Sequence, residues 1–229
     1  MAEYCTQGPV LHTTTTRIHP PSACEELVVI SSDNLELLKT MIHQIARDCP
    51  DRAFKLVATR SYLSPTLLRG VPRDFAPSLD RTLFPVLLNE ADGAAGFSIK
   101  LPRENEPVLM ESAQYLVPVI GIDCINKPMG PELVFRWQTG AEHFSLQAGD
   151  PLTVERAADI LMHKQGVCRD WMPDAEIIPF INKVEDTEQE SAARQLAALI
   201  LKNGNFPVER VVIGSVRLGR SDLIPAPKH

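Results

Sequence analysis

The stretch Phe84-Pro-Val-Leu-Leu-Asn-Glu-Ala-Asp-Gly93 is an apolar run that stops at two carboxylates and a glycine. This pattern predicts a buried parallel β-strand that carries Glu90 and Asp92 to the carboxyl edge of a sheet, where open α/β folds bind their ligands. Two acids that are one residue apart point the same way while the strand continues, so both could address one metal ion. The alternative is a strand end that only places two solvated acids at the surface.

The rest of the chain alternates apolar segments, which predict strands, with amphipathic segments, which predict helices. We expect strands at Val10–His12, Leu27–Ile30, Phe54–Thr59, Tyr115–Asp123, Ala175–Ile181 and Arg210–Ser215. We expect helices at Asn34–Arg47, Glu106–Gln114, Pro131–Gln138, Thr153–Lys164 and Thr187–Lys202, and the last turn of a helix at Ala2–Cys5. The alternation predicts a parallel sheet covered on both faces, in one single α/β domain over residues 1–229. Residues 61–81 predict a proline-rich excursion of loop and short helix, and residues 217–229 a flexible tail.

Composition argues against several classes of partner. The 229 residues carry a net charge of −6 and no basic cluster, so we expect neither nucleic acid nor a membrane surface as a partner. The five cysteines are widely spaced and lack any zinc-binding pattern, which indicates reduced thiols. The longest apolar run, near Leu116–Ile122, is far shorter than the roughly 20 residues that span a bilayer. We therefore predict a soluble, cytoplasmic protein.

A second polar motif, Asn182-Lys183-Val184-Glu185, follows another expected strand, as the guanine-binding Asn-Lys-x-Asp motif of GTPases does. Its fourth residue is glutamate, one methylene longer than aspartate. This difference weakens any specificity for guanine, because hydrogen bonds to a ring edge require a fixed distance. Gly214-Ser215 after the last strand could form a second loop that faces a base. A plain strand-to-helix turn is the alternative for the first loop.

Two further features concern phosphate. Thr13–Thr16 supply hydroxyls at the end of the first strand, where a phosphate or the shell of a Mg²⁺ ion would lie, although taken alone they fit β-propensity and a polar loop better. Lys100 lies near the acid pair in the sequence and could neutralise phosphate charge. The chain contains no Gly-x-x-x-x-Gly-Lys-Ser/Thr, the loop that grips phosphate in P-loop nucleotidases.

Several short segments are unspecific when taken singly, but their order and spacing together are informative. They are spread over the chain from about Gly8 to Val216. They lie at residues 10–21, 89–93, 100–108, 119–123, 149–153, 181–185 and 211–215. Together they resemble the selenium-dependent hydroxylase accessory proteins of the YqeC type. The resemblance implies a three-layer, parallel-sheet, P-loop NTPase-like (Rossmann-type) fold in an accessory protein for the maturation of selenium- and molybdenum-dependent hydroxylases.

The resemblance also implies ligands, partners and roles for single residues. The ligands would be Mg²⁺ and a nucleotide, ATP or GTP, and the partners a molybdenum hydroxylase or its maturation proteins. The implied site residues are Glu90 and Asp92 for the metal and the water, Thr14 and Thr15 for the phosphate and the Mg²⁺ shell, Lys100 for charge, and Asn182, Lys183 and Glu185 for the base.

The chain departs from this family at its start, because family members carry a strand, a Gly-Lys-Thr loop and a helix upstream of the threonine run. We expect that the chain lacks the strand, the loop and most of the helix, so that any NTPase activity belongs to a longer form. The missing strand is expected between the strands at Val10 and near Phe84, and its loss predicts exposed edges and self-association into a homo-oligomer. Two alternatives remain. One is a non-catalytic partner-binding module, and the other is a metal-dependent phosphohydrolase that uses Glu90, Asp92 and Asp123.

Overall fold

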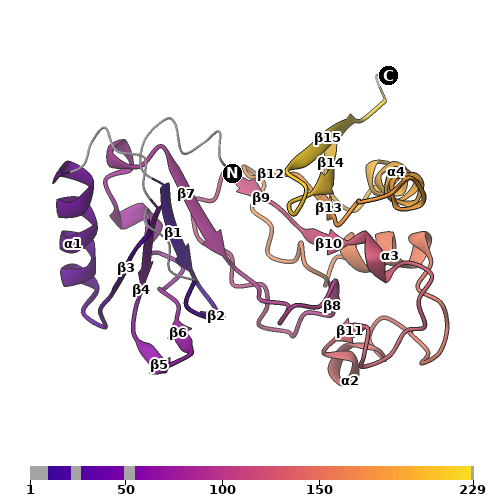
Figure 1. Cartoon of the computed structure of the whole chain (residues 1–229), viewed down its shortest axis with the longest axis horizontal. Coiled ribbons are helices and arrows are strands. Elements are labelled where there is room, and N and C mark those ends of the chain that lie inside the picture. Colours follow the sequence, from indigo (N-terminus) through magenta and orange to yellow (C-terminus); the bar gives the residue numbers. More distant parts are fainter. Residues whose placement is uncertain (1–9, 22–26, 49–54, 228–229) are drawn as a thin grey trace. The chain divides into compact units, whose positions relative to one another are not determined.

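The computed structural model describes residues 10–21, 27–48 and 55–227, and the chain forms two compact units (Figure 1). The N-terminal unit comprises Met1–Gly93 and Val108–Ser112, and the C-terminal unit comprises Ala94–Pro107 and Ala113–His229. Both units combine parallel strands with helices, which confirms the predicted α/β class, whereas the three-layer P-loop NTPase-like arrangement stays a prediction. The sequence predicted one single domain; in the structure each unit has a hydrogen-bonded sheet of its own. The helix turn predicted at Ala2–Cys5 lies outside the described residues.

The N-terminal unit is built on a four-stranded sheet in which all neighbouring strands are parallel. In sheet order the strands are β3 (Leu27–Ser31), β4 (Lys55–Thr59), β1 (Val10–Thr14) and β7 (Val86–Glu90). Helix α1 (Leu35–Asp48) contributes Leu38, Ile42 and Ala46 to the core, because their four-residue spacing places them on one side of the helix. Asn34 begins α1: its Oδ1 accepts hydrogen bonds at 3.1 Å from the backbone N–H groups two and three residues later.

Strand β7 is parallel to β1, as the sequence predicted, but it is not buried. Each residue of Val10–Thr14 is paired with one of Val86–Glu90, so no other strand lies between them. In the part of the chain that the structure describes, β7 is the last strand of its sheet, and its Leu88 is 41% exposed. The prediction of a buried strand here is therefore wrong, whereas the prediction of a further strand between β1 and β7 in a longer form stays a prediction. An apolar run indicates a parallel strand but does not reveal whether its second edge is covered.

Residues 61–81 contain strands as well as the predicted short helices. An antiparallel sheet in the order β2-β6-β5 consists of β2 (Arg17–Ile18), β6 (Leu67–Arg69) and β5 (Tyr62–Ser64), and the short helices are η2 (Ala76–Ser78) and η3 (Arg81–Leu83). Strands of two or three residues are too short to show a hydrophobic period, so the sequence did not reveal them. Gly70, which follows this hairpin, lies close to the main chain of the threonine run. A Cβ at this position would lie 2.5 Å from the carbonyl oxygens of Thr14 and Thr16.

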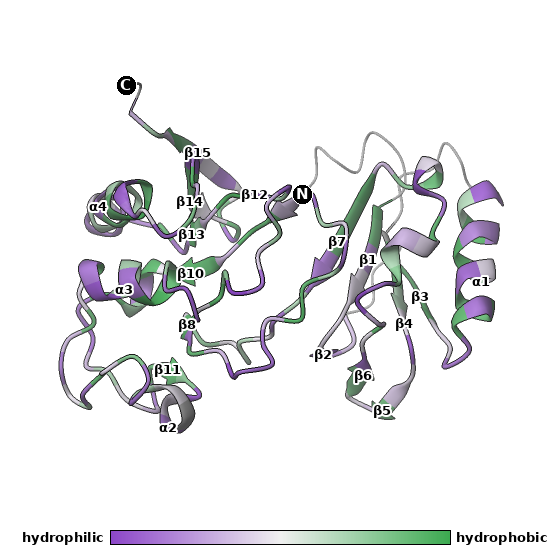
Figure 2. Ribbon diagram, turned by 180° about the vertical axis from the view of Figure 1, so that it is seen from behind, coloured by the Kyte–Doolittle hydropathy of each residue, from purple (hydrophilic) through white to green (hydrophobic). Residues whose placement is uncertain are grey.

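The C-terminal unit has a second four-stranded sheet, with helices packed against it. In sheet order its strands are β10 (Val119–Gly121), β13 (Phe180–Asn182), β14 (Arg210–Ser215) and β15 (Arg220–Pro225), and only β15 is antiparallel to its neighbour. Its core includes residues of β10, β13, β14, α3 (Val154–Leu161) and α4 (Thr187–Lys202). Figure 2 shows both hydrophobic and hydrophilic residues on α4, and the buried ones, Ala193, Leu196, Ala197 and Ile200, have the spacing of one side of a helix.

Two predicted long strands of this unit are each interrupted by a proline. The segment Tyr115–Asp123 supplies β9 (Tyr115–Leu116), β10 and the short helix η4 (Ile122–Cys124), and Ala175–Ile181 supplies β12 (Glu176–Ile177) and most of β13. Pro118 and Pro179 separate the pieces, since proline has no N–H for a ladder. A further parallel pair joins β8 (Ile99–Lys100) and β11 (Val134–Phe135).

Three predicted segments are wrong. Glu106–Gln114 is not helical, and Pro131–Gln138 supplies β11 and only the start of α2 (Trp137–Gly140), with Arg136 in the left-handed conformation between them. The expected tail at 217–229 contains β15, which pairs with β14 at six positions. The sequence of β15 is polar, so the strand depends on the edge of β14 rather than on an apolar period. Among the described residues no helix is long and apolar enough to cross a membrane.

Candidate functional site

Polar side chains gather at the carboxyl ends of β13 and β14 in the C-terminal unit. Asn182 is the last residue of β13, and its Oδ1 accepts hydrogen bonds from the N–H groups of Lys183 at 2.8 Å and Val216 at 3.1 Å. The N–H of Val184 donates to the carbonyl oxygen of Gly214 at 2.9 Å. The two loops that the sequence marked as facing a base therefore lie side by side and are joined by hydrogen bonds.

Glu185 is the carboxylate of this loop. It accepts hydrogen bonds from Arg217 Nε at 2.8 Å and from Ser215 Oγ at 3.2 Å, and Arg217 Nη2 also donates to it. The hydrogen bond from Arg217 is the main reason why the pKa of Glu185 lies below its usual range. Asp186 has a different role: its Oδ1 accepts from the N–H of Gln189 at 2.8 Å and caps α4. Glu185 is thus the acid that this loop presents.

Lys183 connects the loop to the end of β10. Its backbone has a φ of 64°, a left-handed conformation that is uncommon for residues other than glycine. Its Nζ lies 2.7 Å from Ser98 Oγ and 3.0 Å from Asp123 Oδ2, and Ser98 Oγ donates to Asp123 Oδ1 at 2.6 Å. Burial raises the pKa of Asp123, but the hydrogen bonds from Ser98 and Lys183 outweigh it and lower the pKa overall. Sequence reasoning missed Ser98, because a single serine in a loop carries no pattern.

Lys100 lies in a separate, buried ion cluster of the C-terminal unit. Its side chain is 5% exposed, its Nζ is 2.8 Å from Glu106 Oε2, and Arg136 pairs with the same carboxylate. Both cations also lie over the ring of Phe135. Burial raises the pKa of Glu106, and the hydrogen bonds from Lys100 and Arg136 lower it further than burial raises it. Lys100 neutralises Glu106 in this structure, and its role toward phosphate stays a prediction.

The threonine run of the N-terminal unit binds the main chain. Thr14 Oγ1 donates to the carbonyl oxygen of Glu90 at 2.9 Å and accepts from the N–H of Thr16 at 3.0 Å. Thr15 Oγ1 donates to the carbonyl oxygen of Val108 and accepts from Asn89 Nδ2 at 3.1 Å. The one hydrogen of each hydroxyl is used in this way, so donation to a phosphate would need an exchange of partners, whereas each oxygen keeps one lone pair that could face Mg²⁺. The predicted ligand roles of Thr14 and Thr15 stay predictions.

The acid pair ends β7 as the sequence predicted. Glu90 is the last residue of the strand and is exposed, and Asp92 follows two residues later. A Cβ at Gly93 would lie 3.3 Å from Glu90 Oε1, so the glycine leaves room for this carboxylate beside the chain. Within the described ranges, no group of three or more His, Cys, Asp or Glu could hold a metal ion. Mg²⁺ is commonly held by only one or two carboxylates together with phosphate and water, so Glu90 and Asp92 fit it in number.

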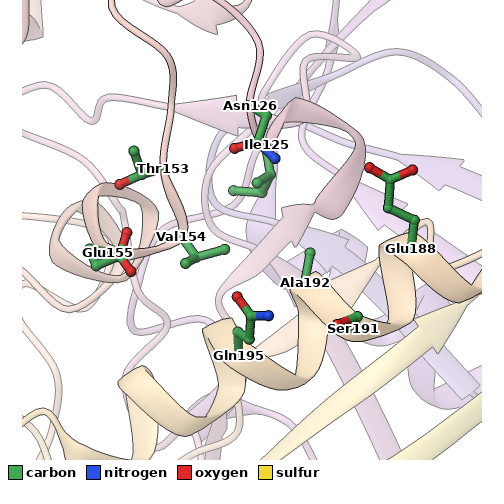
Figure 3. A pocket seen from close by; sticks show the side chains of 9 residues that line it. All are labelled: Ile125, Asn126, Thr153, Val154, Glu155, Glu188, Ser191, Ala192 and Gln195. Carbon is green, nitrogen blue, oxygen red and sulfur yellow. The ribbon is translucent and has the colours of Figure 1, made fainter.

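A hollow of about 400 Å³ lies elsewhere in the C-terminal unit (Figure 3). It is bounded by the residues after η4, the start of α3 and one side of α4, and its lining is Ile125, Asn126, Thr153, Val154, Glu155, Glu188, Ser191, Ala192 and Gln195. Its two ionisable groups are the carboxylates of Glu155 and Glu188, which would repel a phosphate. None of the predicted site residues lines it, so it is a poor place for a nucleotide.

The fold and these polar strand ends define an α/β protein with its candidate site at the carboxyl ends of the parallel strands β13 and β14. The sequence profile of the YqeC protein family matches residues 1–138, and the chain belongs to this family, which confirms the resemblance. The Uncharacterized protein YqeC of Escherichia coli (strain K12) is 26% identical over 132 residues, which are 58% of this chain and 50% of that protein. The chain thus matches about half the length of this curated relative. No solved structure matches the chain.

Proposed function

We propose that this chain binds a purine nucleotide, ATP or GTP, through the loops after β13 and β14, and that it acts as an accessory protein in the maturation of selenium- and molybdenum-dependent hydroxylases. The observation that carries the binding proposal is the fixed orientation of Asn182, whose Oδ1 is held by two backbone N–H groups. The hydroxylase role rests on the family resemblance alone.

The chemistry of the loop fits the edges of a purine base. With Oδ1 of Asn182 engaged, the side chain has its Nδ2 hydrogens left to offer, and these suit the acceptor atoms of a purine. Glu185, three residues later, offers a carboxylate that is kept ionised and can accept from the N–H groups of a base. The side chain of Arg217 is 73% exposed, so a base can displace this ion pair at little loss. The longer glutamate leaves ATP and GTP as alternatives.

A metal ion is the second part of the proposal. Glu90 and Asp92 would hold Mg²⁺ in the N-terminal unit, and Asp92→Asn tests this part separately. Calorimetry with Mg²⁺ alone is expected to show that the variant loses binding of the ion without a change in the fold. Equal Mg²⁺ binding by the variant and the parent chain would contradict the metal role.

Isothermal calorimetry and thermal melting with ATP and with GTP test the base-binding loop. At a ligand concentration near 100 times Kd, binding raises the free energy of unfolding by about 2.7 kcal/mol. This increase raises the melting midpoint of a chain of this size by roughly 5 to 10 °C. Asn182→Ala and Glu185→Gln are expected to weaken binding, whereas Glu188→Gln, an exposed acid on α4, serves as the matched control. Absence of binding, or equal binding by all three variants, would refute the proposal.

One observation favours the alternative function, a partner-binding module without nucleotide turnover. The register of the C-terminal sheet places Val119, Phe180, Val212 and Leu223 in one row across β10, β13, β14 and β15. Val119 is 57% exposed and Leu223 is 51% exposed, so the ends of this row meet solvent. Exposed apolar rows of this kind are typical of interaction surfaces. Size-exclusion chromatography with light scattering, before and after Val119→Glu, tests whether a second copy covers this row; the homo-oligomer predicted from exposed strand edges stays a prediction.

A further inference from the structure

We propose that Ser98 and Asp123 bind the ribose hydroxyls of the nucleotide and that the chain thereby selects ribonucleotides over deoxyribonucleotides. The inference rests on the proposed function, because it assigns the sugar subsite beside the base-binding loop. It adds two residues that neither the family resemblance nor the base-binding motif places in contact with ligand.

The topology brings this subsite next to the base. Strands β10 and β13 are parallel neighbours, and Gly121 is paired with Asn182 in their register. Asp123 follows Gly121 by two residues, and Lys183 follows Asn182 by one, so both leave the same edge of the sheet. Lys183 Nζ and Asp123 Oδ2 are 3.0 Å apart, which shows that the two chain segments meet. A sugar attached to a base at Asn182 would therefore reach the carboxylate of Asp123.

The hydrogen-bond capacity of Asp123 leaves room for two hydroxyls. An ionised carboxylate has about four acceptor sites on its two oxygens. Ser98 uses one site on Oδ1 and Lys183 uses one on Oδ2, and the Asp123 side chain is 34% exposed. Each oxygen thus keeps a further acceptor site. The 2′- and 3′-hydroxyls of ribose are two adjacent donors, and a carboxylate is the group that commonly binds them in dinucleotide sites.

Ser98 and Lys183 keep this carboxylate fixed and ionised. The ammonium of Lys183 has three donor hydrogens, of which Ser98 Oγ and Asp123 Oδ2 receive two. Both hydrogen bonds favour the charged form of Asp123, so the group accepts rather than donates at neutral pH. Ser98 Oγ donates to Asp123 and accepts from Lys183, which leaves one acceptor site for a sugar hydroxyl. The three side chains form one preorganised polar surface.

Gly121 supports the same arrangement. A Cβ at this position would lie 2.6 Å from Asp123 Oδ1 and 2.8 Å from Ser98 Oγ, so any other residue would displace both groups. A purely structural ion pair between side chains that are 40% and 34% exposed would contribute little to stability. The left-handed backbone of Lys183 and the required glycine are better explained by a surface that must keep one shape for a ligand.

The test is a set of dissociation constants measured by calorimetry on the full chain. The ligands are ATP and GTP, each compared with its 2′-deoxy and 3′-deoxy forms. We expect each deoxy form to bind roughly tenfold more weakly than the ribonucleotide, because a hydrogen bond to a charged group is lost. Asp123→Asn and Ser98→Ala are expected to bind the three forms with nearly equal affinity. Asp222→Asn, which removes another partly exposed, ion-paired carboxylate, should keep the parent preference.

The outcomes separate this inference from the proposed function. Binding of all three forms with equal affinity by the parent chain would overturn the ribose subsite and leave nucleotide binding intact. A ribose preference that survives both Asp123→Asn and Ser98→Ala would also overturn it. Absence of binding by any nucleotide would overturn the proposed function and the subsite together. Circular dichroism of each variant shows whether it folds, and the two single variants give independent tests.

Discussion

Replacing Glu106 by glutamine should strongly destabilise the C-terminal unit. The Glu106 side chain is 12% exposed and pairs with Lys100 and Arg136, which are 5% and 16% exposed. Removal of one partner from a buried ion pair destabilises a protein by about 3 to 5 kcal/mol, and here two cations would lose a carboxylate that pairs with both. This cluster is not fully buried, so we expect about 3 kcal/mol. For a chain of this size that loss lowers the melting midpoint by roughly 6 to 12 °C.

The effect should depend on pH in a defined direction. The hydrogen bonds from Lys100 and Arg136 outweigh burial, so the pKa of Glu106 in the folded chain lies below its ordinary value of 4.5. A carboxylate with a depressed pKa stabilises the folded state above its unfolded pKa, and this contribution is lost as the pH falls through the folded pKa. The difference in stability between the parent chain and Glu106→Gln should therefore be full at neutral pH and shrink well below pH 4.5.

Thermal melting by circular dichroism between pH 3 and pH 7 measures both effects. Glu104→Gln is the matched control, since Glu104 is exposed and lies in the same loop two residues earlier. A midpoint for Glu106→Gln within about 2 °C of this control at neutral pH would refute the reasoning, because loss of a buried counter-charge is expected to lower the midpoint by more than that. A difference that grows as the pH falls would refute the assigned sign.

Two other predictions concern packing and thiols. Gly70→Ala should destabilise the N-terminal unit by about 1 to 3 kcal/mol, because its Cβ would meet backbone oxygens 2.5 Å away; an unchanged urea midpoint would show that the hairpin moves aside. Cys124 and Cys168 are free and buried, and burial raises the pKa of each to about 12, so neither should be alkylated at neutral pH before unfolding. Peptide mapping after iodoacetamide treatment checks this, and fast labelling of either cysteine in the native chain would contradict it.

Helices and strands whose own sequence has a clear hydrophobic pattern or a capping residue were predicted well. The bounds of α4 and of β14 are the predicted ones, because the helix has an amphipathic period and a cap at Asp186, and the strand is a compact apolar run. Strand β15 was missed because its sequence is polar and it forms a strand by pairing with β14, which no local pattern reveals. The short strands within residues 61–81 were missed for the same reason, because they too form by pairing with neighbours. Tertiary pairing, rather than local propensity, decides such segments.

The candidate site was also predicted only in part. The ends of β13 and β14 could be predicted to meet, because neighbouring parallel strands deliver their loops to one edge. The partners of single side chains could not be predicted: Ser98 and Arg217 have no motif, and the hydroxyls of the threonine run turned out to bind main-chain carbonyls. A sequence shows which residues reach an edge, whereas their hydrogen-bond partners depend on loops that are distant in the chain.

The two lysines that the sequence predicted as site residues show what this distinction means for function. Lys100 was predicted to neutralise phosphate, but its 5% exposed side chain is paired with Glu106, and a phosphate there would have to enter the core and break that pair. Lys183 was predicted to contact the base, and its side chain is 40% exposed beside Asp123. This partly solvated ammonium has a third donor hydrogen besides those bonded to Ser98 and Asp123, so it can contact a ligand and still hold Asp123. For the nucleotide that we propose, the charge is therefore better assigned to Lys183, whose left-handed backbone lies at the edge of the sheet with the proposed base-binding loop.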